Sequence, residues 1–316
     1  RRCLMDPEGA ALVALDPSLY ENAGYVGNRS KRELQEASDP YYTYADTIRD
    51  ILLTILARDR FPLEARLFSL ASFAGNTAPF FFKGTKDFSE DRLALEVDKA
   101  ADHVYETAWA ESIQGMEVPL ALPMTEVQAL FLSAFRRSVP ELRALLFPAW
   151  SAYTGESAER AFLSTQQGED AVTLACDNIV AGYRARRDHL FDRFQPQIDG
   201  CMGNYARQFV FTKVYMDFPN LLNYVHRLIL QTALVKFLFV SHPLVSPILS
   251  SGESEGGEGS KDQEDPESRV TQALVDSVFR LARGIEHNKR FLPDLEQTLS
   301  EQGMQDLAHA ALLARL

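Results

Sequence analysis

Cysteine is scarce in this chain of 316 residues. The three cysteines, Cys3, Cys176 and Cys201, lie too far apart for a CxxC pair, and their small odd number suits a reducing cytoplasm better than a disulfide framework. Cys176 falls in an apolar helical pattern and is expected to be packed. Cys201 is either a reactive thiol or, in the favoured interpretation, a structural residue. The six histidines show no HExxH or paired spacing, so we expect no metal site within this chain.

Positive charge is also in short supply, because 32 Lys and Arg residues face 44 Asp and Glu residues, which gives a formal net charge of −12. This balance argues against nucleic acid or an anionic membrane surface as a partner, since counterion release needs clustered basic residues. The longest apolar run, Leu221 to Val240, is interrupted by polar side chains at a density that is costly in a bilayer. No signal-like segment opens the chain, so we predict a cytoplasmic protein without a membrane-spanning helix.

Alternation of period two between hairpin turns is missing, so the sequence predicts an all-α protein, an irregular multi-helix bundle. A helical hairpin is expected from 42 to 73, with Ile48, Ile51, Leu52, Ile55 and Leu56 on one face of its first helix and Pro62 as the first residue of its second. Ser89 is expected to cap a helix that runs to about Ile113, with Leu93, Leu95, Val104 and Trp109 among its apolar contacts. Further helices are expected over 7–15, 125–135, 140–147, 156–163, 170–194, 270–281, 288–299 and 305–316.

Large apolar residues are absent from 250–268, which reads SSGESEGGEGSKDQEDPES and carries seven acids against one lysine. Such a segment cannot bury enough surface to offset its ordering entropy, so we predict a disordered acidic loop. The glycines in this loop follow no strand and are therefore no nucleotide-binding loop. The loop separates a helical body at 1–249 from C-terminal helices at 269–316 that pack back on it, one domain overall. A second irregular segment, 75–89, carries Phe80 to Phe82 and is predicted to dip into the core.

What the sequence does possess is one strongly apolar stretch, residues 203–243, in which two aromatic-rich helices meet at Phe218-Pro219 after a turn at Asp199-Gly200. It is predicted to form the core, yet it holds more polar side chains than a purely structural hairpin needs. The arginines between Arg184 and Arg193 allow two interpretations. They bind an anionic group or, as we favour, form a solvated helix face that pairs with the surplus carboxylates. His287 likewise is either a base or a polar contact at a helix end.

Four segments, in order along the chain, resemble the flagellin lysine-N-methylases: LMDPEGAALVALDP, IRDILLTILARDRFPLEARLFSL, NYARQFVFTKVYMDFP and VFRLARGIEHNKRFLPDL. The resemblance implies methylation of flagellin lysine side chains with S-adenosylmethionine. It also implies a cysteine-rich N-terminal module that holds an iron-sulfur cluster, which we expect to lie before residue 1. The family's cysteine in the first segment falls on Asp6 here, so a thiolate role is not carried over to that position.

A lysine must be neutral to attack a methyl group, so a methylation site needs burial or a proton acceptor, with aromatic faces for the developing cation. With the resemblance, we predict two catalytic residues, Tyr205 and His287. The predicted substrate-binding residues are Asn204, Tyr215, Tyr224, His226, Glu286 and Asn288. Two alternatives stay open at this point. One is a non-catalytic helical module that binds a protein or peptide, and the other is the ligand-binding domain of a regulator.

Overall fold

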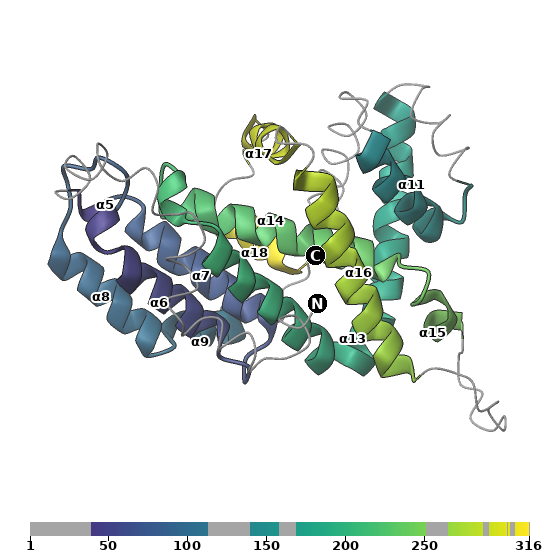
Figure 1. The fold of residues 1–316 in the computed structure, drawn as a ribbon, viewed down its shortest axis with the longest axis horizontal. Helices are drawn as coiled ribbons and strands as arrows, with labels where there is room; N and C mark the ends of the chain where they lie inside the picture. Colours follow the sequence, from purple (N-terminus) through teal and green to yellow (C-terminus); the bar gives the residue numbers. More distant parts are fainter. Residues whose placement is uncertain are drawn as a thin grey trace. The chain divides into compact units, whose positions relative to one another are not determined.

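The computed structural model describes residues 39–112, 140–157, 169–250, 265–286, 291–301, 303 and 307–315. Within these ranges the regular elements are helices, and the one strand-like contact is an isolated antiparallel bridge between Phe82 and Asn220 (Figure 1). The all-α prediction is confirmed. The chain divides into two compact units. The first unit comprises Arg1–Met116, Asp199–Leu230 and Asp306–Ala314, and the second comprises Glu117–Ile198, Gln231–Gln305 and Arg315–Leu316.

The first unit is built around α7, Leu63–Thr77, which contacts three neighbouring helices (Figure 1). These are α6 (Ala45–Leu56), α8 (Glu90–Ala101) and α9 (Val104–Ser112), and the short α5 (Pro40–Thr43) precedes them. Small residues such as Ala65, Ser69 and Ala71 are buried along α7, which allows its neighbours to approach closely. Pro62 is the residue before α7 and has extended backbone angles, so the helix starts one residue later than predicted.

The predicted helix from Ser89 to about Ile113 is in fact two helices. Ser89 caps α8 as expected, accepting the N–H of Arg92 at 3.4 Å. The chain then leaves the helix at His103, whose φ of 59° is a left-handed conformation that ends helices. The change of direction breaks the predicted apolar stripe, because Leu93 and Trp109 are buried whereas Leu95 and Val104 are 54% and 45% exposed.

The irregular segment between α7 and α8 enters the core as predicted. Phe80 and Phe81 are 1% and 0% exposed. The bridge at Phe82 and a hydrogen bond from the Lys83 N–H to the Pro219 carbonyl at 3.2 Å tie this segment to the start of α14, Leu221–Val240. The turn before α14 contains a 3₁₀ helix, Tyr215–Asp217. The predicted junction at Phe218-Pro219 therefore exists.

The second unit contains α11 (Pro140–Thr154), α15 (Ser246–Ser250), α16 (Pro266–Glu286) and α17 (Phe291–Glu301), whereas α18 (Leu307–Arg315) belongs almost wholly to the first unit. The predicted end of α11 at Phe147-Pro148 is wrong, since the helix continues through Pro148 and buries Ala149 and Trp150 beyond it. α16 starts four residues before the expected Val270. The predicted helices at 7–15 and 125–135 lie outside the described residues, as does most of the acidic loop and of 156–163.

The longest helix, α13, spans Glu169–Thr212 and contributes residues to both units. It bends at Phe194, where φ is −126° and ψ is 15°, two residues before Pro196. A proline removes a helical hydrogen bond and clashes with the preceding turn, which accounts for the bend. The turn predicted at Asp199-Gly200 is therefore wrong, because both residues are helical and the change of direction occurs earlier.

Candidate functional site

Two of the predicted substrate-binding residues, Tyr215 and Tyr224, belong to a buried aromatic cluster of the first unit. Their rings lie 6.4 Å apart, and the Tyr215 ring is 4.9 Å from that of Tyr41. The Tyr215 hydroxyl donates to the Tyr41 carbonyl at 2.5 Å, and the Tyr224 hydroxyl donates to the Lys213 carbonyl at 3.0 Å. Burial raises the pKa of both phenols. Both hydroxyls thus act as hydrogen-bond donors to backbone carbonyls in the core.

Asn204 and Tyr205 lie on the part of α13 that belongs to the first unit. Asn204 is 2% exposed, and its side-chain oxygen accepts a hydrogen bond from Arg207. Tyr205 is half-buried, and burial raises the pKa of its phenol. His226 is half-buried on α14. The structure therefore pairs Asn204 with Arg207 and places Tyr215 and Tyr224 in the aromatic cluster.

Of the remaining predicted residues, Glu286 is described: it is the last residue of α16 and belongs to the second unit. His287 and Asn288 lie outside the described residues. The catalytic roles of Tyr205 and His287 stay predictions.

A polar network of the first unit, which we call the arginine network, is centred on Arg66, which is 1% exposed on α7. Its Nη1 donates to the Leu56 carbonyl and to Asp59 Oδ1, both at 2.8 Å, and its Nη2 donates to the Asp199 carbonyl at 3.4 Å. The Asp199 carboxylate in turn accepts the first N–H of α7, from Leu63, at 3.2 Å. Burial is the main cause that lowers the pKa of Arg66. The network ties the corner between α6 and α7 to α13.

The tract from Arg184 to Arg193 is more than a solvated face, because one of its arginines bonds to backbone carbonyls. Arg186 donates to the Val240 carbonyl at 3.1 Å, to the Ala152 carbonyl at 3.5 Å and to Ser246 Oγ at 3.1 Å. Val240 and Ala152 lie in the last turns of α14 and α11, where carbonyls lack helical partners. Arg186 therefore donates hydrogen bonds to the C-terminal carbonyls of two helices in the second unit, a role that the sequence alone did not suggest.

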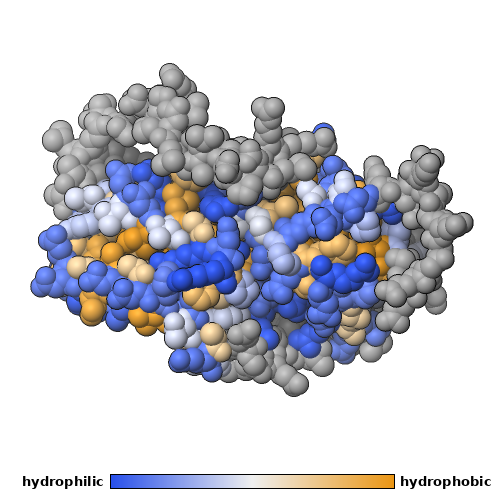
Figure 2. All heavy atoms as spheres, turned by 90° about the horizontal axis from the view of Figure 1, so that it is seen from below, coloured by the Kyte–Doolittle hydropathy of each residue, from blue (hydrophilic) through white to orange (hydrophobic). Residues whose placement is uncertain are grey.

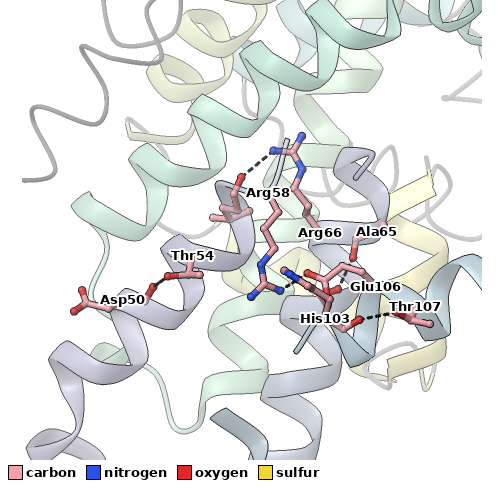
Figure 3. Close-up of polar contacts among 10 residues, drawn as sticks. Asp50, Thr54, Arg58, Ala65, Arg66, His103, Glu106 and Thr107 are labelled. Atoms are coloured by element: carbon pink, nitrogen blue, oxygen red, sulfur yellow. Dashed lines mark hydrogen bonds and ion pairs between the residues drawn. The ribbon is translucent and has the colours of Figure 1, made fainter. Parts of the chain in front are cut away.

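A second polar cluster, which we call the Glu106 cluster, contains Glu106, Arg58 and His103 (Figure 3). Glu106 is 0% exposed, and its Oε1 pairs with Arg58 Nη1 at 2.6 Å. In the described part of the chain, Glu106 Oε2 and His103 Nδ1 are buried and have no hydrogen-bond partner. Burial lowers the pKa of His103, and the positive charges of Arg58 and Arg60 lower it further. Its imidazole is accordingly neutral near pH 7.

Aromatic side chains flank the Glu106 cluster. The Phe61 ring lies 5.7 Å from the His103 ring, and the Arg60 guanidinium stacks 4.9 Å from the Phe61 centroid. Phe61 also packs on a small apolar cluster whose buried members are Ala65, Phe68, Trp109 and Ala311. No motif in the sequence marked this site. Glu106 stands three residues before a tryptophan in a helix, which resembles an ordinary solvated position.

Both described cysteines are packed rather than exposed. Cys176 is fully buried, as expected, and burial raises the pKa of its thiol to about 12. Cys201 is half-buried, and burial raises its pKa as well. Both thiols are therefore protonated near neutral pH, which argues against a reactive Cys201.

The surface drawn in Figure 2 mixes hydrophilic residues with scattered hydrophobic patches. None of the helices in the described ranges is both long and apolar enough to span a bilayer.

The described residues define an all-helical protein whose first unit holds a buried carboxylate beside an imidazole, each with a buried atom that no described residue hydrogen-bonds. A family model described as the FliB lysine N-methylase C-terminal domain matches residues 49–313, and the chain belongs to this family. The resemblance noted in the sequence is thereby confirmed. No curated protein and no solved structure matches the chain.

Proposed function

We propose that this chain takes part in methylating lysine side chains of flagellin, with S-adenosylmethionine as the methyl donor and in the cytoplasm. The observation that carries the proposal is the family match over residues 49–313. The chemistry of the first unit supports it, because a lysine must lose its proton before methylation and the Glu106 cluster offers a buried carboxylate beside a neutral imidazole.

The iron-sulfur cluster that the resemblance implies does not fit the cysteines present here. Such clusters are typically held by four thiolates, whereas this chain has three cysteines. Cys176 is fully buried with a raised pKa, so its thiolate form is disfavoured. We propose that a cysteine-rich module outside residues 1–316 supplies the ligands, and no chemical step here depends on the cluster.

The tyrosines expected to bind substrate do not fit the methyl donor either. The rings of Tyr215 and Tyr224 pack against other aromatic rings, and both hydroxyls are engaged by backbone carbonyls. The position of S-adenosylmethionine is therefore not assigned to them.

The proposal is tested by incubating the complete protein, prepared anaerobically, with S-adenosylmethionine and flagellin. We expect mass gains on flagellin lysines that vanish when the donor is omitted. If the folded protein binds flagellin without methylating it, the alternative of a non-catalytic peptide-binding module is correct and the enzymatic proposal is wrong.

The predicted catalytic residues are tested in the same assay with Tyr205→Phe and His287→Asn. Loss of methylation in either variant, with its fold intact by circular dichroism, supports a role at the site. Methylation at the wild-type rate in the double variant removes both residues from it.

A further inference from the structure

The Glu106 cluster holds two buried polar atoms that no described residue hydrogen-bonds. Arg58 engages Oε1 of Glu106 at 2.6 Å, whereas Oε2 has no hydrogen-bond partner within the described residues. His103 lies three residues earlier, just before α9, and its Nδ1 likewise is buried and has no hydrogen-bond partner among the described residues. A buried carboxylate oxygen without a hydrogen bond is costly, so a protein that keeps one has a use for it.

The chemistry of these two atoms selects the class of ligand. An ionised carboxylate only accepts hydrogen bonds, and the lowered pKa of His103 favours a neutral imidazole, in which one ring nitrogen is an acceptor. With the lone pair on Nδ1, both vacant atoms are acceptors, which suits a ligand rich in N–H donors and not an anion. An ammonium group presents three donors on one nitrogen.

The surroundings also suit the side chain that carries such a group. His103 and Phe61 are only partly buried, and the neighbouring Val104 is 45% exposed, so this side of the cluster reaches the protein surface. The Phe61 ring, 5.7 Å from the imidazole, offers an apolar wall against which the methylene stem of a lysine can pack.

We propose that the Glu106 cluster binds the acceptor lysine of the protein substrate and takes its proton, an assignment that rests on the proposed function. Glu106 Oε2 accepts a hydrogen bond from the ammonium group. The N–H bond of a second ammonium proton breaks as that proton bonds to His103 Nδ1, which leaves a neutral amine with a free lone pair and an imidazolium that later releases the proton to water.

The electrostatic surroundings of this transfer contain charges of both signs. Arg58, Arg60, Glu106 and Asp102 are the charged groups that act on His103, and burial and the two arginines lower its pKa although the two acids raise it. For an amine bound beside the same groups, the positive charge of the arginines favours the neutral form, whereas the Glu106 carboxylate holds the ammonium form until the proton is transferred.

Binding is tested on the 316-residue chain with n-butylamine as the probe, followed by the NMR resonance of the His103 ring. We expect the resonance to shift on addition of n-butylamine and not of n-butanol. Glu106→Gln, which still accepts from Arg58, should weaken binding about tenfold or more, the effect of losing one charge-assisted hydrogen bond. Glu111→Gln, an exposed position on the same helix, is the matched control. Equal binding by both variants would overturn the proposal.

The proton transfer is tested in the complete enzyme with two replacements that tolerate the left-handed backbone of His103, where φ is 59°. His103→Asn keeps a hydrogen-bond acceptor but takes no proton, and His103→Gly removes the side chain. We expect His103→Asn to lower kcat about 100-fold, flatten the acidic limb of the pH profile and leave KM nearly unchanged. Glu106→Gln should mainly raise KM.

These two measurements separate the inference from the proposed function. If the wild-type enzyme does not methylate flagellin but n-butylamine still binds in a manner that depends on Glu106, the amine site stands and the proposed function falls. If the enzyme methylates flagellin and the His103 and Glu106 variants do so at the wild-type rate, the proposed function stands and the amine site is wrong.

Discussion

Arg66 shows how a single buried charge organises the first unit. It makes its hydrogen bonds to a helix-end carbonyl at Leu56, to Asp59 and to the α13 backbone at Asp199, although it is 1% exposed. Asp59 itself is largely exposed, so water can replace its bond to Arg66, whereas the Leu56 carbonyl, at the end of α6, accepts its bond from the guanidinium in the core. The loss of Arg66 should therefore be felt mainly at this helix end.

We expect Arg66→Met to lower the free energy of unfolding by about 2–3 kcal/mol, since hydrogen bonds to a charged group are worth about 1.5–3 kcal/mol. Urea unfolding measures this change. Arg49→Met is the matched control, because Arg49 pairs with Asp46 at 3.0 Å on the exposed surface and should contribute below about 1 kcal/mol. Equal losses of unfolding free energy in the two variants would show that the buried network stabilises the protein no more than an exposed ion pair does.

His242 is a second residue whose surroundings make a measurable prediction. It is 5% exposed, its Nδ1 accepts the Leu244 N–H at 3.3 Å, and its Nε2 has no hydrogen-bond partner in the described ranges. Burial is the main cause that lowers its pKa, and the charge of Arg280 adds to the effect. The folded protein thus keeps this imidazole neutral at pH values where the unfolded chain already binds a proton.

The sign of the resulting pH dependence follows. As pH falls below the unfolded value of about 6.5, the unfolded state gains protons first, so the stability that His242 supports is lost. We expect His242→Asn, which keeps an acceptor for Leu244, to lose less unfolding free energy between about pH 7 and pH 5 than the wild type. Urea titrations at both pH values measure the difference. An equal loss of unfolding free energy in the variant and the wild type would contradict the prediction.

At the scale of elements, two glycines of α13 have opposite surroundings. A Cβ added at Gly182 would lie 2.1 Å from the backbone carbonyl oxygen of Tyr153, which belongs to α11. A Cβ added at Gly200 meets no atom within 4 Å. The first glycine therefore permits close packing of two helices, whereas the second only lowers helix propensity.

We expect Gly182→Ala to destabilise the protein by about 1–3 kcal/mol or more, as overpacking against backbone does. Gly200→Ala should stabilise it by up to about 1 kcal/mol, because alanine is the better helix former. Thermal unfolding followed by circular dichroism compares them directly. A stabilising Gly182→Ala would mean that α11 and α13 do not approach as closely as described.

Helix positions were largely predictable from periodicity, and helix ends less so. The apolar spacing of α6 and the Ser89 cap of α8 appeared directly in the sequence and are confirmed. The break at His103 was not predictable, because a histidine in a left-handed conformation has no strong sequence signal. The continuation of α11 through Pro148 depends on the burial of Trp150 beyond it, a tertiary effect.

At the scale of the whole molecule, the net charge of −12 bears on the encounter with a lysine-bearing substrate. An acidic protein attracts basic surface groups, and salt screens this attraction beyond about 10 Å at 0.1 M ionic strength. We expect kcat/KM for flagellin to fall as ionic strength rises from about 0.05 to 0.5 M, with kcat nearly unchanged. Steady-state methylation rates measure both quantities, and a salt-independent kcat/KM would exclude electrostatic steering.

The candidate site was only partly predictable. Asn204 and Tyr205 were singled out from an apolar stretch with unexpected polar residues, and Asn204 is indeed buried and accepts a hydrogen bond from Arg207. Tyr215 and Tyr224 belong to the core, because their hydroxyls satisfy backbone carbonyls that only folding brings within reach. The sequence alone could not reveal that Tyr41 and Tyr215, which are far apart in the chain, pack against each other in the core.

The sequence by itself determined the helical class of this protein and its family, since both depend on local periodicity and on ordered motifs. Tertiary structure decided which polar residues remain available for chemistry. Glu106 resembled a solvated helix residue, yet folding buries it completely, gives one oxygen to Arg58 and leaves the other without a partner among the described residues. Burial and pairing are properties of contacts between segments far apart in the chain, so local sequence does not encode them in readable form.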